Sequence, residues 1–513
     1  MHWAPAGRRS DSARRRGAIL KTSAGARMIA TYLHRFIVAA TLLASAVGQP
    51  HVSPMAGRWF PADPGRLHLA VERAWVEAGT RTGTTHPRPG LLGLVAPHAG
   101  IEYSGGVAAA AYRQIGSPPN IILLGFSHRF PLEGVAAPRV TAYTSPAGTA
   151  PVNSEAIAEL GAALMDEERL CDHSLENHLP FLRRAAPQAK LIPLYVGSLT
   201  AKQLAEVGRK IAARVSRGDL VIASSDFTHY GKNYGHTPFP NDQQLPDRLR
   251  ERANEAFEEI SSLDATAFDR FLARTGDTIC GRDPIRLLMA AMAAIPGEDV
   301  YMEVLDSRLS GELTRDYSLS VTYGALGFYP ASSFAVSGQA RRRLLAHSRA
   351  ALEAHLDGKG AAAFNGPASP ELERRAGVFV TIRKQGELRG CVGTLAPRLP
   401  LPGMVADRTV AAARSDPRFR SLSREEGPVK VEVSLLTPLK RLPDWRAYRE
   451  GLGGVLVLGN NGGLLLPQVA REMGWSARQF LEGLSRKAGL PPLAYQDPKA
   501  RLYVFRAQVF GED

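Results

Sequence analysis

The sequence predicts a doubly wound α/β sheet followed by a smaller α+β unit. From Gly57 to about residue 329, apolar runs of strand length end abruptly in polar clusters and precede Ala- and Leu-rich helical stretches. Such alternation is typical of a mainly parallel sheet covered by helices. After a stretch rich in Ser, Ala and Gly at 328–343, the pattern changes to two hairpins, one alternating strand and a helical end. We therefore expect two domains, joined by a linker at 330–340.

The N-terminal 50 residues differ in composition from the rest of the chain. Residues 1–46 hold eight Arg or Lys and one Asp, a net charge of +7, so the remaining 467 residues carry 14 − 7 = +7. This modest excess argues against nucleic acid as the partner. A basic flank, an apolar run from Phe36 to Val47 and the small residues before Val47 resemble a signal peptide ending near Ala46. An over-extended reading frame is the alternative, and no run reaches the roughly 18 apolar residues of a membrane span.

The cysteine count bears on the compartment. Cys171, Cys280 and Cys391 are too few and too scattered for a disulfide framework, and an odd count leaves at least one thiol unpaired. Unpaired thiols suit the reducing cytoplasm. We therefore expect a cytoplasmic protein in which residues 1–50 are dispensable, with export through the N-terminal signal as the alternative.

Three predicted strands of the first unit each lead to a histidine. The runs "LLGLVAPHAG", "NIILLGFSH" and "DLVIASSDFTH" end near His98, His128 and His229. Ligands of open α/β sheets bind outside the carboxyl ends of the strands, so these histidines can converge without being close in sequence. For any single one, a hydrogen-bonded structural role is the alternative.

The segment "DTICGRDPI" places Cys280 just before a predicted helix. Asp283 can cap that helix and Pro284 fits its first position, so the helix dipole would favour a thiolate at Cys280. Two neutral imidazoles and a thiolate make a three-ligand metal site with open positions, unlike a closed structural zinc site. A buried, inert cysteine is the alternative.

A further polar cluster is "CDHSLENHLPFL", which contains His173, Glu176 and His178. Histidines five apart on one helix point about 140° away from each other, so both cannot serve one metal. We expect at most one of them to reach the cleft. A serine hydrolase is a poor fit, because "GFSHR" lacks the second glycine of a G-x-S-x-G elbow.

In the second unit, "ELRGCVGTL" places Arg389 and Cys391 on one face of a predicted strand. A buried cysteine with an extended arginine is one interpretation. The other is an exposed binding or nucleophilic thiol beside a cation that lowers its pKa.

Five motifs of the first unit, in order, resemble the Memo-like proteins, known in prokaryotes as AmmeMemoRadiSam system protein B. They are "APHAGIEYSG", "GFSH", "HSLENHLPFL", "SSDFTHYG" and "TICGRDPI", and the resemblance covers residues 54–329. Residues 341–511 resemble the AMMECR-type family, AmmeMemoRadiSam system protein A, through "LRGCVGT", "DPRF", "VEVSLL" and "GLLLPQVA". The chain is thus similar to a fusion of two proteins often encoded beside a radical S-adenosylmethionine enzyme.

The resemblance implies the fold of the class III extradiol dioxygenases, with metal-site residues at His98, His128 and Cys280. It places His229 where those enzymes have their acid/base histidine, and Asp226 or His178 is expected to orient its ring. Cys280 stands where the dioxygenases use a carboxylate, which puts ring cleavage in doubt.

Fe(II) is the expected metal and copper the alternative, because thiolate is a softer ligand. The resemblance also implies a radical S-adenosylmethionine partner, acting on a small molecule or a peptide. A non-catalytic adaptor that uses the same cleft for a peptide or a partner protein is the competing hypothesis.

Overall fold

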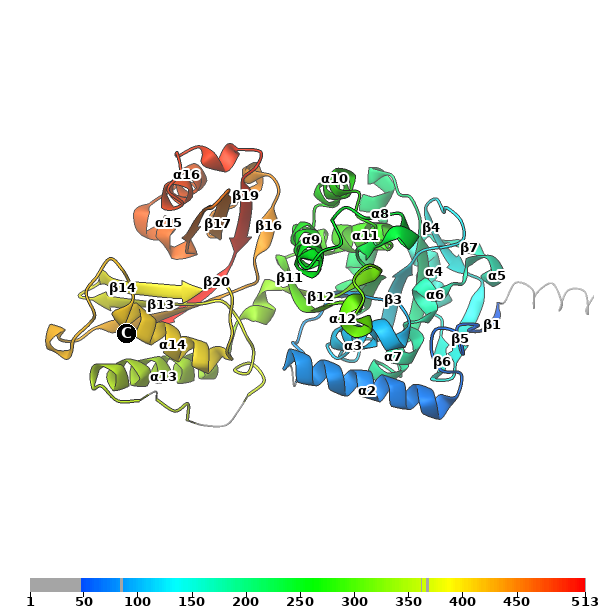
Figure 1. Ribbon diagram of the computed structural model, residues 1–513, viewed down its shortest axis with the longest axis horizontal. Helices are drawn as coiled ribbons and strands as arrows, with labels where there is room; N and C mark the ends of the chain where they lie inside the picture. Colours follow the sequence, from blue (N-terminus) through cyan, green and yellow to red (C-terminus); the bar gives the residue numbers. More distant parts are fainter. Residues whose placement is uncertain (1–47, 84–85, 361, 366–368, 513) are drawn as a thin grey trace, which may run out of the picture.

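The computed structural model describes residues 48–83, 86–360, 362–365 and 369–512. The signal-like segment at 1–46 lies outside these residues. Figure 1 shows two bodies side by side, the first running from β1 to η2 and the second from α13 to β20. Within the described part of the chain, no helix combines the length and the apolar character needed to cross a membrane.

The first body is built on a nine-stranded sheet with the order β10-β12-β2-β9-β3-β8-β4-β7, to which β11 adds by pairing with β12. Its centre is parallel, because β2 pairs with β9, β9 with β3 and β3 with β8 in that sense, whereas β10, β11 and β12 pair antiparallel. A small separate sheet has the order β1-β5-β6. The strands are β1 (Gln49–Val52), β2 (Gly93–Ala96), β3 (Asn120–Gly125), β4 (Val135–Pro138), β5 (Val140–Ser145), β6 (Gly148–Pro151), β7 (Ala163–Met165), β8 (Lys190–Val196), β9 (Leu220–Ser224), β10 (His229–Tyr230), β11 (Val300–Leu309) and β12 (Ser320–Pro330).

Helices cover both faces of this sheet, as a doubly wound fold requires. Side chains alternate along a strand, so Leu123 packs into the core shared with α2, α3 and α7, while Ile122 packs into the core shared with α8, α9 and α11. The helices are α2 (Pro64–Thr82), α3 (Ile101–Tyr112), α4 (Ser154–Leu160), α5 (Glu167–Leu170), α6 (His173–Glu176), α7 (Leu179–Ala185), α8 (Ala201–Val215), α9 (Leu245–Ser261), α10 (Ala265–Thr275), α11 (Arg282–Ala293) and α12 (Ser310–Thr314), with the 3₁₀ turns η1 (Lys232–Tyr234) and η2 (Ala331–Phe334).

The second body has two four-stranded sheets, β14-β13-β15-β20 and β16-β19-β17-β18. Helices α13 and α14 pack on the first sheet and α16 packs on the second. Its elements are α13 (Gly338–Leu356), β13 (Val378–Lys384), β14 (Glu387–Thr394), α14 (Leu401–Arg414), η3 (Arg424–Glu426), β15 (Lys430–Leu436), β16 (Lys440–Leu442), η4 (Trp445–Ala447), β17 (Gly453–Leu458), β18 (Asn461–Leu465), α15 (Pro467–Met473), α16 (Ala477–Lys487), η5 (Ala494–Gln496), β19 (Arg501–Phe505) and β20 (Ala507–Gly511).

Both predicted hairpins are present, since β13 pairs with β14 and β17 with β18 in antiparallel fashion. The turn of the second hairpin is tight, because Leu458 already pairs with Asn461. The helical end is split into α15 and α16, because Gly474 adopts a left-handed conformation with φ 63° that ends the first helix.

The connection between the two bodies is short, and the contacts across it are largely polar. Phe334 packs with Tyr301 and Tyr329 of the first body, whereas Val336 already belongs to the core of the second. Asp299 of the first body pairs with both Arg449 and Arg506 of the second.

We predict that the two bodies fold independently, because the large hydrophobic cores of each are built from its own residues. Fragments 48–335 and 336–513, expressed separately, should each unfold in one cooperative transition, followed by circular dichroism against urea. If neither fragment unfolds cooperatively, the two bodies depend on each other for a shared core.

Candidate metal centre

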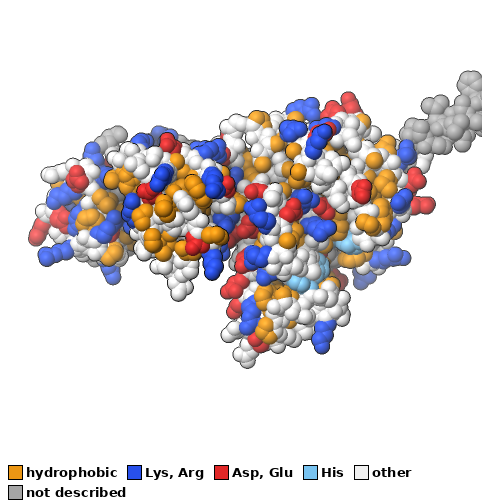
Figure 2. Space-filling model, turned by 90° about the horizontal axis from the view of Figure 1, so that it is seen from above, with side chains coloured by type: hydrophobic (Ala, Val, Ile, Leu, Met, Phe, Trp, Pro, Cys, Tyr) orange, Lys and Arg blue, Asp and Glu red, His pale blue; other side chains and the backbone are white. Residues whose placement is uncertain are grey.

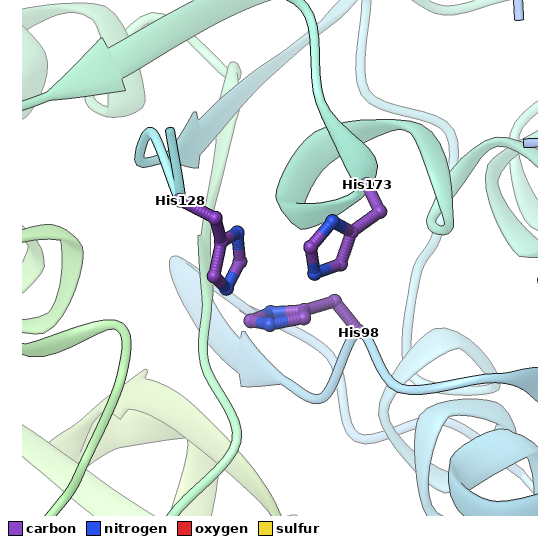
Figure 3. A group of neighbouring side chains, drawn as sticks. All are labelled: His98, His128 and His173. Atoms are coloured by element: carbon purple, nitrogen blue, oxygen red, sulfur yellow. The ribbon is translucent and has the colours of Figure 1, made fainter. Parts of the chain in front are cut away.

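Three histidines meet at the carboxyl end of the parallel sheet. Strand β9 lies between β2 and β3, so the segments that follow β2 and β3 emerge at the same edge. Figure 3 shows His98, His128 and His173 pointing toward one another, from the ends of β2 and β3 and the start of α6. A ligand nitrogen of each lies within 4.8 Å of the other two.

Hydrogen bonds fix which nitrogen of His98 is free. Its Nδ1 lies 2.8 Å from the Ser224 hydroxyl, whose one proton is donated to the Ser174 carbonyl oxygen. The Ser224 oxygen must therefore accept from His98, so Nδ1 carries the proton and Nε2 carries the lone pair. Burial lowers the pKa of His98 well below its usual range, and His128 and His173 add to the effect. The ring is neutral, the form that binds a metal.

His128 is held in the same way by a carboxylate. Asp172 accepts the backbone N–H of His128 at 2.9 Å and faces Nδ1 of its ring at 3.1 Å. Burial opposes the ionisation of Asp172, but these hydrogen bonds outweigh it and lower the pKa of this carboxyl. Because a carboxylate only accepts, Nδ1 of His128 donates, and in the neutral ring Nε2 carries the lone pair. Metal-binding histidines in proteins are oriented by such partners.

His173 is the third member of the group. Its ring stacks on His128, with centroids 4.0 Å apart, and on Trp59, with centroids 4.2 Å apart. Burial lowers its pKa to about 4. His173 is therefore also neutral at neutral pH and available as a ligand.

Cys280 approaches the centre from the other side of His98. Its Sγ lies 3.6 Å from Nε2 of His98 and accepts the backbone N–H of Asp226 at 3.3 Å. The ligand atoms of Cys280, His98 and the Asp226 carboxylate form a second group within 4.8 Å. The expected ligands are thus distributed over two groups that share His98, with His128 in one and Cys280 in the other.

The expected cap next to Cys280 is wrong. Helix α11 begins at Arg282 after Gly281, and Asp283 lies inside its first turn, without a side-chain capping bond at Gly281. Glycine is required at 281 because a Cβ there would lie 2.2 Å from the Ser224 carbonyl oxygen. Burial, then the Asp226 carboxylate, raises the pKa of the Cys280 thiol. Burial therefore outweighs any effect of the helix N-terminus on this thiol, and a bound cation would be needed to displace the proton.

His229 lies on the short strand β10, and the segment before Cys280 holds it. Its backbone N–H donates to the Thr278 hydroxyl at 2.8 Å, and its Nδ1 lies 3.1 Å from the Thr278 carbonyl oxygen. A carbonyl only accepts, so Nδ1 carries the proton and Nε2 carries the lone pair. The expectation that Asp226 or His178 orients this ring is wrong, because Thr278 does so.

The two residues proposed to orient His229 have other partners. Asp226 accepts the backbone N–H of His98 at 3.0 Å, and burial raises its pKa. His178 lies 2.9 Å from the Ser224 hydroxyl through Nε2 and 2.7 Å from the Tyr112 hydroxyl through Nδ1. Both residues support His98, one through its backbone and the other through Ser224.

The remaining candidates lie away from this centre. Glu176 is fully buried and pairs with His51 at 3.3 Å. In the second body, Arg389 forms a two-point ion pair with Glu426, at 2.8 and 2.7 Å. Burial raises the pKa of Cys391, and the nearby cation that acts on its thiol is Arg418 rather than Arg389.

Sequence reasoning missed the residues that fix the tautomers. Ser224 and Thr278 carry no motif that assigns them a partner, although Ser224 stands in the "SSDFTH" segment that also holds His229. The alternation of β9 places Ala223 and Ser224 on opposite faces, and the position of Ser224 at the strand end is the signal that could have identified it.

Taken together, the chain is a two-body α/β and α+β protein with a histidine- and cysteine-rich centre at the carboxyl edge of its large sheet. Residues 52–327 match the model of the Memo-like protein family, and residues 345–510 match that of AMMECR1. The chain therefore belongs to the Memo-like family and carries an AMMECR1 domain after it. The first body accordingly has the doubly wound α/β sheet that the sequence predicts.

Individual relatives and a solved structure match parts of the chain. A MEMO1 family protein of Methanopyrus kandleri is 31% identical over 290 residues, which are 53% of this chain and 97% of the relative. A protein of Methanothermobacter thermautotrophicus is 42% identical over 180 residues, 34% of this chain and 94% of the relative. The crystal structure of an uncharacterized protein of Pyrococcus horikoshii is 35% identical, covering 33% of this chain and 90% of that one, with a TM-score of 0.32.

The buried His178 predicts a loss of stability in acid. Burial lowers its pKa from 6.5 to about 3. Below pH 6.5, His178 is therefore protonated in the unfolded chain but stays neutral in the folded chain. Between these values His178 should contribute up to about 1.4 kcal/mol of lost stability per pH unit. In urea unfolding measured between pH 4 and 7, the free energy of unfolding of His178→Gln should fall less steeply with decreasing pH than that of the native chain. The exposed His68→Gln should show the same pH dependence as the native chain. Equal slopes in all three proteins would contradict the buried, neutral state of His178.

Proposed function

We propose that the first body is a metal-dependent oxidoreductase whose metal is held by His98, His128 and Cys280. The proposal is carried by one observation. In both His98 and His128 a hydrogen bond occupies Nδ1, which leaves Nε2 to bind a metal. His98 is buried and neutral, and metal-binding histidines in proteins are commonly oriented through their other ring nitrogen in this way. Histidine side chains also reach the surface in Figure 2, in keeping with a centre open to a substrate.

The donor set fits a first-row transition metal. Imidazole nitrogen suits iron, copper and zinc, and a thiolate draws the preference toward softer ions. Fe(II) is our first choice and copper our second. His173 competes with Cys280 for the third position, because each lies in a group with His98.

When bound, the metal would act as a Lewis acid and redox partner for a substrate oxygen. The protein's own residues supply the proton chemistry. His229 presents the lone pair of Nε2 while Thr278 fixes its Nδ1, so it can take a proton from a substrate hydroxyl and return it later. Asp226 and Ser224 hold His98 in place during these steps.

Elemental analysis of the purified chain should find a transition metal in the wild type and lose it in His98→Ala and in His128→Ala, because each removes one neutral nitrogen ligand. Cys280→Ser and His173→Ala decide the third position, since the variant that loses the metal identifies the ligand. Exposed His68→Gln serves as the control. Full retention of the metal in both His98→Ala and His128→Ala would contradict the site.

Substitution of His229 should separate proton transfer from metal binding. His229→Ala should keep the metal and reduce oxygen uptake, with a catechol as the probe, by about 10²- to 10⁴-fold. Thr278→Val should keep the metal as well, because Thr278 is not a proposed ligand. This variant also retains the backbone carbonyl that orients the His229 ring. Loss of the metal in His229→Ala would make this residue a ligand, and the assignment would have to change.

The radical S-adenosylmethionine partner and the adaptor hypothesis remain predictions of the sequence resemblance. Polar contacts between the two bodies, such as the Tyr503 hydroxyl to Glu258 at 2.6 Å, support joint action of the Memo-like body and the AMMECR1 domain. Metal-dependent oxygen uptake favours the oxidoreductase. Partner binding that persists in His98→Ala favours the adaptor.

A further inference from the structure

A second group of metal-ligating side chains lies between β1 and α6, apart from the first centre. It consists of His51 on β1, Cys171 after α5 and Glu176 at the end of α6. Their ligand atoms lie within 4.8 Å of one another, and all three residues are buried. None of them belongs to either group that contains His98.

The Glu176 carboxyl group has one buried oxygen without a hydrogen-bond partner among the described residues. Its side chain is fully buried, and Oε1 lies 3.3 Å from Nε2 of His51. Its other oxygen, Oε2, has no hydrogen-bond partner among the described residues. A buried carboxylate oxygen without a partner is costly, and each such group in a native protein requires an explanation. A metal ion among the three side chains would supply one.

One of the three distances in this group suits neighbouring ligands of a tetrahedral ion. Zinc binds nitrogen and oxygen at about 2.0–2.2 Å and sulfur at about 2.3 Å, which places neighbouring ligand atoms about 3.3–3.6 Å apart. The 3.3 Å between His51 and Glu176 matches such an edge. A neutral imidazole, a thiolate and a carboxylate are all donors that zinc accepts, and the two anionic ligands balance its charge inside the protein.

Neighbouring residues support the same set of ligands. Nδ1 of His51 lies 3.8 Å from the Glu167 carboxylate, which suits a histidine that binds metal through Nε2 and faces a carboxylate with its other nitrogen. The Tyr143 hydroxyl lies 3.3 Å from Sγ of Cys171 and can donate a hydrogen bond to a thiolate. The ligands therefore have supporting partners of the kind found around metal ions.

We propose that His51, Cys171 and Glu176 bind one zinc ion, at a three-ligand site distinct from the first centre. The thiol proton of Cys171 is released to solvent when the ion binds. The ion would tie β1 to the segment that contains Asp172 and His173, and so would fix the part of the chain that orients His128. This proposal does not depend on the proposed function, because its ligands are different residues.

The test uses Co²⁺ alone as the probe in the full chain. Because the sequence has three cysteines, the variant Cys280→Ser with Cys391→Ser leaves Cys171 as the sole thiol. Added Co²⁺ should then give a near-ultraviolet sulfur-to-cobalt charge-transfer band. Adding Glu176→Gln should abolish the band, whereas the exposed Glu168→Gln should leave it unchanged.

Absence of the band in a folded double variant, with native circular dichroism, would overturn the proposal and leave His51 and Glu176 as an ion pair. The wild-type chain gives a second measurement that needs no substitution. Native mass spectrometry should show a zinc ion in the chain, whether or not the first centre also holds a metal. A chain without zinc after purification in zinc-containing buffer would also overturn it, whatever the outcome at His98.

Discussion

The lateral pairing of β2, β9 and β3 is the constraint on which the centre depends. Parallel strands in register bring their carboxyl ends to one edge, so the residues just beyond them meet although about 130 positions separate His98 from His229 in the sequence. The apolar faces of the same strands fix that register, since a shift of one residue would exchange the two cores. The packing of the sheet and the geometry of the centre thus have one cause.

A small set of hydrogen bonds then decides the chemistry at that edge. The Ser224 hydroxyl oxygen accepts hydrogen bonds from His98 and His178, because its own proton is donated to a backbone carbonyl oxygen. The same serine therefore sets the tautomers of two histidines. Asp172 does the same for His128, and the Thr278 carbonyl for His229. As a result, three imidazoles present Nε2 lone pairs at the edge of the sheet.

Much of this arrangement could be predicted from the sequence, because it follows from local patterns. Apolar runs identified the strands, and the histidines after them indicated the edge at which His98 and His128 meet. His173 joins the group and His178 turns to Tyr112, as expected, but the two do not share one helix, because α6 ends at Glu176 and α7 begins at Leu179.

The rest depends on contacts between distant segments, which no local pattern encodes. The partner of His229 is a backbone carbonyl 49 positions further along the chain. Every residue has such a carbonyl, so the sequence does not indicate which one is the partner. The pKa of Cys280 follows from burial beside Asp226 rather than from the helix that comes after it. The pairing of His51 with Glu176 spans 125 positions and joins residues from different motifs.

The central claim is that His98 and His128 offer Nε2, not Nδ1, to a common metal ion. Anomalous diffraction at the absorption edge of the bound metal, in crystals of the full chain, tests it most directly. We predict one strong peak within coordination distance of Nε2 of both His98 and His128, with Nδ1 of each still on Ser224 and Asp172. A peak bound through Nδ1 of either ring, or a loaded crystal without a peak between these two residues, would contradict the account.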